Sequence, residues 1–447
     1  MSKKTFYLII FIFIVLGAVW GVWFFKQRAT VADPNAGLTL RDFFPFGNTP
    51  STETPASTDT ETPGEAPTGD EPVVTPPVPI LQKISSMPIA GAVVFEKERP
   101  VTETATAALA TDPAPTTTTE TNKTKSAPKP TTELAAAVRY TERERGHIYE
   151  TYLDTIVEKK ISNTTIPRIH EAFFGSKGET AILRYLESDN RTITTFAAGL
   201  PKEIPGGDSI LDIKGGFLPS NISDLAIAPD TKKVFYLMPY TSSIIGTTSF
   251  FDGSQKTQLF GSEFTEWLSQ WATARTILLT TKPSYAFAGY AYTLDTQTKS
   301  FDKLISAVPG LTTLMSPNGK LILYSESAGN SVSLKVFNVD TRESTDTGAR
   351  TLPEKCTWGT NSEYAYCAVP TELPRANYPD KWYQGEVSFN DQIWKLDVRA
   401  NFMTIVADPF AITGEEVDAI KLSMDQKESY LIFTNKKDSY LWALNLK

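Results

Sequence analysis

Residues that bind metals or cross-link chains are scarce in this sequence. Its 447 residues include two cysteines and two histidines, which excludes a disulfide-dense scaffold and any site built from many cysteines or histidines. There is also no basic excess, because 43 Lys and Arg stand against 51 Asp and Glu and the net charge is −8. Proteins that bind nucleic acid usually carry a basic excess or stripe, so we expect no nucleic-acid partner. We likewise expect no metal and no cofactor.

The standard catalytic signatures are missing as well. The sequence contains no P-loop, no Gly-x-Ser-x-Gly nucleophile elbow, no paired-histidine zinc motif, no Cys-x-x-Cys pair and no EF-hand loop. A serine triad would need His147 or His170, and neither lies in a catalytic motif. The sequence therefore predicts no catalytic residue.

A long uncharged run lies near the N-terminus, at residues 5–25. As a helix its 21 residues extend about 30 Å, the thickness of a bilayer core. A cleaved signal peptide is the alternative, but its apolar region is usually shorter. We expect residues 1–28 to form an uncleaved single-pass anchor. Positive residues flank the run almost equally, so they favour a cytoplasmic N-terminus only weakly.

Residues 29–79 are expected to form a disordered linker. Residues 47–79 hold eight Pro, eight Thr and six acidic residues without any Lys, Arg or aromatic residue, and such a segment buries too little apolar area to fold. A similar Thr-rich tract at residues 100–133 is predicted to be a disordered insertion. Before the linker, Phe43, Phe44 and Phe46 form either a juxtamembrane contact with lipid or a docking motif for another envelope protein.

From residue 80 onward the sequence indicates strands and turns rather than helices. Six segments share one form, an apolar strand, a short polar turn and a second strand rich in Ile, Val, Leu, Phe and Tyr. Their spacing is in the mid-forties with two longer intervals, which suits four-stranded propeller blades. The six turns centre near Lys177, Asp230, Thr273, Asn318, Thr360 and Gln426.

A seventh repeat is split by the Thr-rich tract. Residues 88–95 read as its inner strand and residues 136–140 as the partner. The last repeat ends with three strands, and residues 80–85 form a lone strand before the first repeat. The sequence therefore predicts an all-β, seven-bladed β-propeller over residues 80–447. The N-terminal strand closes the ring beside residues 441–446, which removes open sheet edges.

The turn of the fourth complete repeat carries a recognisable motif. Residues 316–324 read SPNGKLILY, and residues 228–233 read APDTKK. These segments resemble the "SPDGK-x-I-x-Y" repeat of WD-repeat-like bacterial propellers, which include the periplasmic Tol-system protein and the propeller domains of prolyl-oligopeptidase-type enzymes. The resemblance implies a fold rather than a function. The hydrolase domain of the peptidases has no counterpart in these residues, so their chemistry is not expected.

Blade six of the predicted propeller has a long loop between its second and third strands, within residues 367–394. A loop in blade four occupies the equivalent place. In propellers this connection opens on the same face as the blade-to-blade loops, which is the usual ligand side. The residues expected to bind a ligand or partner in these two loops are Tyr378, Asp380, Trp382, Tyr383, Glu386, Asp391, Lys282 and Tyr285.

Three interpretations of the blade-six loop remain open. In the first interpretation, Trp382 and Tyr383 only pack a long loop against the propeller surface. Alternatively, aromatic faces and a few polar groups form a site for glycan or peptide. In the third interpretation, carboxylates of the 373–391 loop hydrolyse a glycan or peptide bond.

The two cysteines flank one hairpin of blade six. Cys356 and Cys367 are expected to lie nearly opposite each other on adjacent strands. A disulfide is favoured outside the cytoplasm, whereas the strained geometry between neighbouring strands favours free thiols.

From these features we expect a membrane-anchored, extracytoplasmic propeller of the cell envelope. Its expected role is a protein- or glycan-binding scaffold module without catalysis. An envelope hydrolase that acts on glycan or peptide through the 373–391 carboxylates is the alternative.

Overall fold

The computed structural model describes residues 80–100, 132–200 and 212–447. The predicted anchor at residues 1–28 and the linker at residues 29–79, with Phe43, Phe44 and Phe46, lie outside these ranges. So does the predicted insertion, apart from residues 100, 132 and 133. Across the three described ranges, no helix has the length and apolar character needed to cross a membrane.

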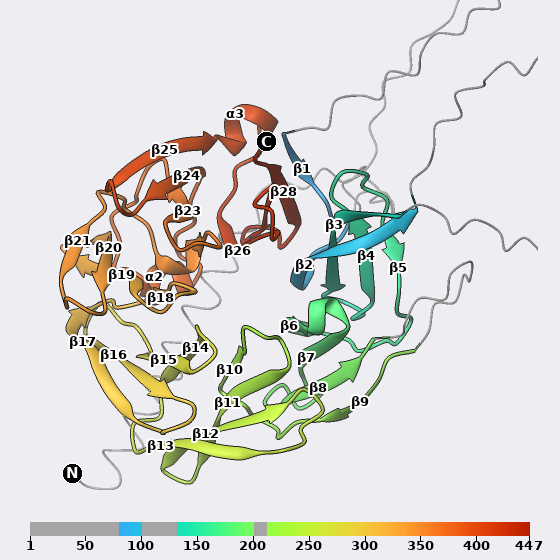
Figure 1. Ribbon diagram of the computed structural model, residues 1–447, viewed down its shortest axis with the longest axis horizontal. Coiled ribbons are helices and arrows are strands. Elements are labelled where there is room, and N and C mark those ends of the chain that lie inside the picture. Colours follow the sequence, from blue (N-terminus) through green and yellow to red (C-terminus); the bar gives the residue numbers. More distant parts are fainter. Residues whose placement is uncertain (1–79, 101–131, 201–211) are drawn as a thin grey trace, which may run out of the picture. The chain divides into compact units, whose positions relative to one another are not determined.

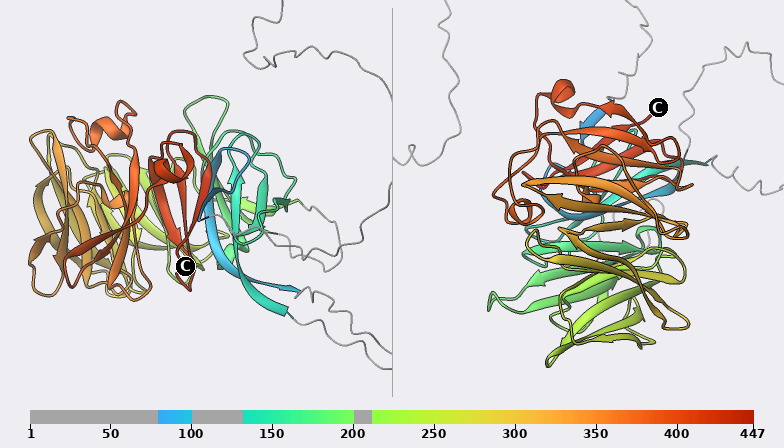
Figure 2. Two further views of the ribbon diagram at one scale, coloured as in Figure 1. Left: turned by 90° about the horizontal axis from the view of Figure 1, so that it is seen from above. Right: turned by 90° about the vertical axis from the view of Figure 1, so that its left-hand side faces the viewer.

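The residues from Ile80 onward form seven four-stranded antiparallel sheets arranged radially around a central hollow (Figure 1). In each sheet the first strand of the repeat lies nearest the centre and the last lies at the rim. Seen from the side, the sheets stand next to one another like the blades of a propeller (Figure 2). The predicted all-β, seven-bladed propeller is therefore confirmed.

The strand bounds follow the repeats. Blades one to three contain β2 (Ile89–Pro100), β3 (Thr132–Glu142), β4 (Ile148–Tyr152) and β5 (Lys159–Lys160); β6 (Ile169–Gly175), β7 (Thr180–Leu186), β8 (Ile193–Gly199) and β9 (Lys214–Phe217); and β10 (Asp224–Ile227), β11 (Lys233–Tyr240), β12 (Ser243–Phe250) and β13 (Thr257–Ser262). Blades four and five contain β14 (Trp267–Trp271), β15 (Thr276–Thr281), β16 (Ala288–Asp295) and β17 (Phe301–Pro309); and β18 (Thr313–Met315), β19 (Leu321–Ala328), β20 (Ser331–Asn338) and β21 (Ser344–Asp346).

The last two blades carry most of the short helices. Blades six and seven contain β22 (Cys356–Trp358), β23 (Tyr364–Pro370), β24 (Asp391–Asp397) and β25 (Phe402–Ala407); and β26 (Ala419–Met424), β27 (Tyr430–Asn435), β28 (Leu441–Asn445) and β1 (Leu81–Lys83). The helical turns are η2 (Ser176–Gly178), η3 (Pro353–Lys355), α2 (Asp380–Tyr383) and α3 (Pro409–Thr413).

Strand β19 shows why the repeats become blades. Gly319 has φ +73°, a conformation that glycine adopts without strain, so the SPNG turn closes the hairpin that leads into β19. Successive side chains of a strand point to opposite faces. Ile322 therefore packs with residues of blade four, and Leu323 packs with residues of blade six. Each blade is thus buried on both faces and stable only between two neighbours.

The N-terminal strand closes the ring as predicted. Strand β1 pairs with β28, with Leu81 opposite Leu444. The pairing extends beyond the strand bounds, because the Ile84 N–H donates to the Leu441 carbonyl at 2.7 Å and the Asn445 N–H donates to the Ile80 carbonyl at 2.7 Å. The first and last segments of the propeller therefore share one sheet, in which β1 supplies the outer, fourth strand of blade seven.

Blade one brackets the Thr-rich tract. Strands β2 and β3 pair as far as Pro100 opposite Thr132. The strands are longer than residues 88–95 and 136–140, the segments expected from the sequence. The tract thus connects two neighbouring strands of blade one, at the hairpin position that other blades fill with a short turn.

Candidate functional site

Two loops meet on the face where second strands connect to third strands. One loop joins β23 to β24 and carries α2, and the other joins β15 to β16 in blade four. The Asp380 carboxylate accepts hydrogen bonds from Ser284 Oγ at 3.0 Å and from the Tyr285 N–H at 2.7 Å. The long loop therefore reaches past blade five, and the two loops singled out in the sequence touch each other.

Much of the blade-six loop is buried. Tyr378 is 0% exposed and Trp382 is 3% exposed, and both pack with Phe389. Trp382 Nε1 donates to Asp418 Oδ2 at 2.9 Å, and Lys436 Nζ donates to the Trp382 carbonyl at 2.7 Å. These two aromatic side chains therefore fix the loop to blades six and seven, and their rings offer no face to a ligand.

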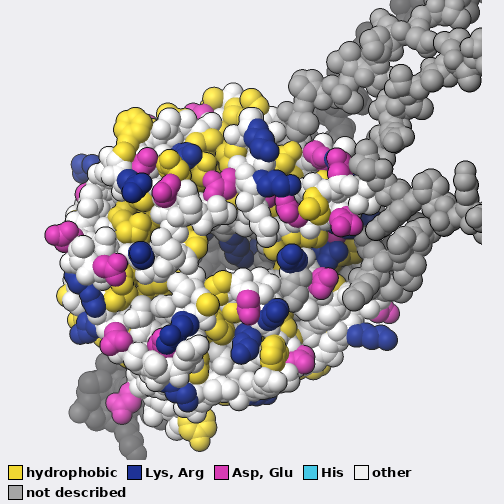
Figure 3. Space-filling view, in the orientation of Figure 1, with side chains coloured by type: hydrophobic (Ala, Val, Ile, Leu, Met, Phe, Trp, Pro, Cys, Tyr) yellow, Lys and Arg dark blue, Asp and Glu magenta, His cyan; other side chains and the backbone are white. Residues whose placement is uncertain are grey.

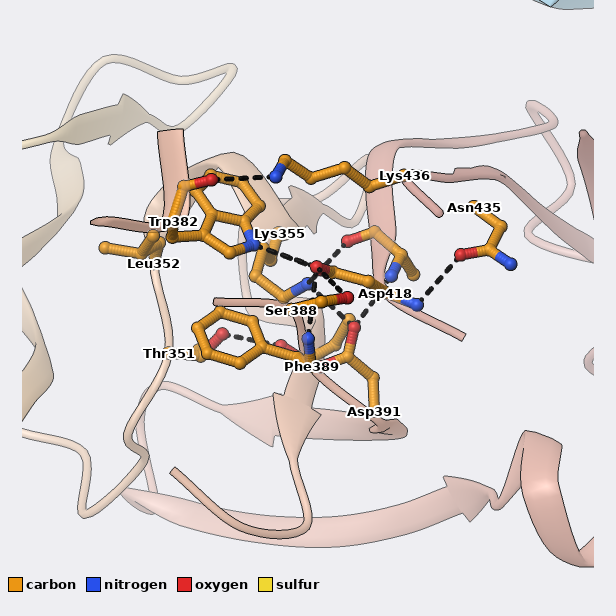
Figure 4. Close-up of polar contacts among 12 residues, drawn as sticks. Thr351, Leu352, Lys355, Trp382, Ser388, Phe389, Asp391, Asp418, Asn435 and Lys436 are labelled. Atoms are coloured by element: carbon orange, nitrogen blue, oxygen red, sulfur yellow. Dashed lines mark hydrogen bonds and ion pairs between the residues drawn. The ribbon is translucent and has the colours of Figure 1, made fainter. Parts of the chain in front are cut away.

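Under Trp382 lies a buried charged cluster (Figure 4). Lys355 Nζ forms ion pairs with Asp391, at 2.7 Å, and with Asp418, and the side chains of all three residues are 0% exposed. Burial raises the pKa of Asp391 to about 6, and the nearby Lys355 ammonium opposes this shift. Asp391, expected to contact ligand, instead holds β24 to η3 and to the start of β26, where its Oδ2 accepts the Ala419 N–H at 2.7 Å.

Glu354 was not identified from the sequence. Its carboxylate accepts hydrogen bonds from the Tyr383 hydroxyl and, at 2.9 Å, from Thr312 Oγ1. Burial raises the pKa of Glu354, and these two hydroxyl donors oppose the shift. Tyr383 is 43% exposed, whereas Glu354 is half-buried, so the pair joins a sheltered carboxylate to a side chain that solvent reaches. Glu354 stands just before an inner strand without any motif around it, and therefore gave no signal.

An aromatic groove of about 710 Å³ lies between blades three and four. Lys282 and Glu266 form an exposed ion pair at 2.9 Å on it. Ser284 lines the groove and also donates to Asp380, so one loop connects the groove to the blade-six loop. The aromatic side chains of the groove are Phe264, Trp267, Phe287, Tyr290, Tyr292 and Phe301.

The remaining predicted residues have simple surroundings. Glu386 is exposed and pairs with Lys381 at 2.6 Å. Tyr285 is 45% exposed beside Asp380. Cys356 and Cys367 lie opposite each other in the register of β22 and β23 and form a disulfide. Within the described ranges, no group of three or more His, Cys, Asp or Glu residues is placed to hold a metal ion.

Among known proteins, the chain is similar to solved structures, and this similarity is one of fold. No family model matches the chain, and no curated protein matches it. An oligogalacturonate lyase in complex with manganese has a TM-score of 0.45 at 10% identity, over 70% of this chain and 86% of that chain. TolB from Acinetobacter baumannii has a TM-score of 0.38 at 10% identity, over 58% of this chain and 59% of that chain. A puromycin hydrolase has a TM-score of 0.42 at 12% identity, over 67% of this chain and 48% of that chain.

These similarities concern the fold. The expected resemblance to the Tol-system propeller is confirmed, since TolB is among the similar structures. The expectation of a scaffold without catalysis is corrected, because an oligogalacturonate lyase and a puromycin hydrolase, both enzymes, have the same type of fold.

Proposed function

We propose that this propeller is a hydrolase that cleaves a glycan chain at the loop face of blades four to six. The observation that carries the proposal is the half-buried Glu354 carboxyl group, held by the hydroxyls of Thr312 and of the partly exposed Tyr383. A carboxylic acid whose pKa is raised by burial is suited to act as a general acid near neutral pH.

Asp380 supplies the second carboxyl group that glycoside hydrolysis requires. The Tyr383 hydroxyl is close enough to both carboxylates to be affected by them. Burial raises the pKa of this hydroxyl most, and the charges of Glu354 and Asp380 raise it further. In the proposed reaction Glu354 donates its proton to the glycosidic oxygen as the bond from that oxygen to the anomeric carbon breaks. Water adds to the anomeric carbon, and the Asp380 carboxylate takes the proton that the water loses.

The aromatic groove supports a sugar chain as the substrate. A pocket lined by aromatic side chains with a few polar groups is typical of ligand sites, and this one places exposed aromatic rings beside the Lys282–Glu266 pair. Ser284 belongs to the loop that connects the groove to Asp380. A glycan bound along the groove would extend over this loop toward Glu354.

The test is hydrolysis of a panel of polysaccharides and peptidoglycan by the purified chain. We expect Glu354→Gln to lower the rate at least about 100-fold, because amides donate no proton to a leaving group. Glu386→Gln is the matched control, since Glu386 is exposed and paired with Lys381, and we expect it to retain the wild-type rate. A folded Glu354→Gln protein with wild-type activity, or no product from any substrate, would refute the proposal.

We further propose that the hydrolase works outside the cytoplasm, tethered by residues 5–25 to the membrane. The disulfide between Cys356 and Cys367 supports an oxidising compartment, because such bonds rarely persist in the cytosol. An envelope glycan then lies within reach of the linker. Protease treatment of intact cells is expected to remove the propeller, whereas cleavage only after cell lysis would place it on the cytoplasmic side.

A further inference from the structure

The inner strands of three consecutive blades are irregular at the same end. The pairing of β26, β2 and β6 with their neighbours shifts register near Ile420, Ile89 and Ile169. The inner strands of the other four blades, β10, β14, β18 and β22, pair without any shift. Bulges redirect side chains and are frequent next to active sites. Their grouping on blades seven, one and two marks one sector of the central mouth.

Each bulge leaves residues unpaired. His170 lies between Ile169 and Glu171, which pair with consecutive residues of β7. Lys421 lies in the shift between Ile420 and Ser423, and its Nζ donates to the Ala90 carbonyl, the unpaired residue of β2, at 3.1 Å. The bulges of blades seven and one are therefore linked by a lysine side chain.

Backbone strain accompanies two of these bulges. Arg168 has φ +60° and Lys421 has φ +54°, in the left-handed region that residues with a Cβ rarely adopt. Such conformations persist where the surrounding structure enforces them and cluster at functional sites. Here they bring one arginine and one lysine to the same sector of the mouth as His170.

The charges around His170 are mostly positive. Burial lowers the pKa of His170; Glu171 opposes this, whereas Arg184, Arg143 and Lys421 reinforce it. Glu171 is engaged by the Arg184 guanidinium in an ion pair. Arg143 and Lys421 remain as positive charges without a carboxylate partner of their own among the ion pairs that the described residues form.

A cavity of about 460 Å³ opens at this place. Arg143, Arg168 and His170 line it. Two acidic residues also line it: the carboxylate of Glu142 accepts the Arg145 N–H of its own loop at 3.0 Å, and Glu144 is exposed to solvent, as Arg143 and Arg168 are. In the space-filling view Lys and Arg side chains are visible in and beside the central hollow (Figure 3).

We propose that this sector of the mouth binds an oxyanion through Arg143, Arg168 and His170, which line the cavity, with the Lys421 ammonium of the adjoining bulge as a nearby positive charge. The ligand group is a carboxylate or a phosphate, because both present oxygen acceptors to guanidinium, ammonium and imidazole donors. The cavity has room for a sugar-sized molecule that carries such a group. This site does not include Glu354. Anion binding to it can therefore be measured whether or not the protein hydrolyses a glycan.

The chain offers a direct probe, because it contains two histidines. We expect inorganic phosphate or glucuronate, added to the full-length chain labelled with ¹³C on its histidine rings, to raise the pKa of His170, since a nearby anion favours the imidazolium. His147 is 8% exposed beside Thr165 and does not line the cavity, so its signal is expected to stay unchanged. A His147→Gln variant assigns the two signals.

The titrations use low ionic strength and both anions separately. We expect Arg143→Gln to weaken anion binding about tenfold through the loss of one charge-assisted hydrogen bond. Lys421→Met should weaken it by a smaller factor, because it removes a neighbouring positive charge that does not line the cavity. Lys427→Met, in the opposite turn where Lys427 pairs with Glu96 at 2.8 Å, is the control and should bind like the wild type. The anion that binds more tightly identifies the group as carboxylate or phosphate, and equal binding indicates a general oxyanion site. An unchanged His170 signal at 20 mM of either anion, or wild-type binding by both variants, would overturn the proposal.

Discussion

Replacing Lys355 with methionine is expected to lower the free energy of unfolding by about 3–5 kcal/mol at pH 7. The lysine ammonium lies between the Asp391 and Asp418 carboxylates, and all three side chains are 0% exposed. Methionine fills a similar volume but leaves both carboxylates without a counter-charge. The cost is therefore electrostatic and does not come from a packing cavity.

Urea denaturation followed by tryptophan fluorescence measures this loss. Lys381→Met is the matched control, because Lys381 forms only a surface pair with Glu386, worth less than about 1 kcal/mol. The loss also depends on pH. Burial already raises the pKa of Asp391 to about 6 in the presence of the lysine, so ionised Asp391 weakens the folded state above that pH. Without the lysine this pKa is expected to rise further, so protonation of Asp391 removes this penalty as the pH falls toward 6, and the variant should approach the wild type by pH 4.

A variant that loses as much stability at pH 4 as at pH 7 would contradict this electrostatic explanation. So would a Lys355→Met protein as stable as the wild type at neutral pH. In that case the two carboxylates would share a proton without help from the lysine, and the ion pairs would contribute little to folding.

The propeller itself was predictable because its information is local and repeated. In a hairpin such as the one around Asn318, about fifteen consecutive residues contain the turn and both strands. A spacing near 45 residues then indicates the size of one blade. Ring closure was predictable from the strand that the last repeat lacked. The ends of the strands were not predictable. Strand β2 continues to Pro100 and β3 begins at Thr132, so both extend into a tract whose composition argues against strands.

The site was only partly predictable because composition does not reveal the direction of a side chain. The blade-six loop was found, and its contact with blade four is present through Asp380. Trp382 and Asp391, however, point into the protein, where they bind Asp418 and Lys355. Glu354 and the bulged His170 acquire part of their surroundings from other blades, through residues such as Thr312 and Lys421 that are far away in sequence, and no local pattern records such contacts.

Weakening the N-terminal strand is expected to have the largest effect on stability. Leu81 and Ile84 are 4% and 2% exposed, and they pack in two different clusters, Leu81 between blades six and seven and Ile84 between blades seven and one. Truncation of a buried Leu or Ile to alanine typically costs 2–5 kcal/mol. Because the clusters are separate, the costs should nearly add. The double variant should lose about 4–10 kcal/mol, a large part of the total stability of a typical domain.

Hydrogen exchange separates ring opening from general destabilisation. The amides of Ile84 and Asn445 donate across the seam between β1 and β28. In the Leu81→Ala, Ile84→Ala protein these amides should exchange faster than the amides of β19, which lies in blade five, two blades from the seam. Leu323→Ala, in β19, is the matched control, since it removes the same buried side chain but leaves the seam intact. If the seam amides stayed as protected as those of β19, the ring would not depend on its N-terminal strand for closure, and the blades would hold together through face-to-face packing alone.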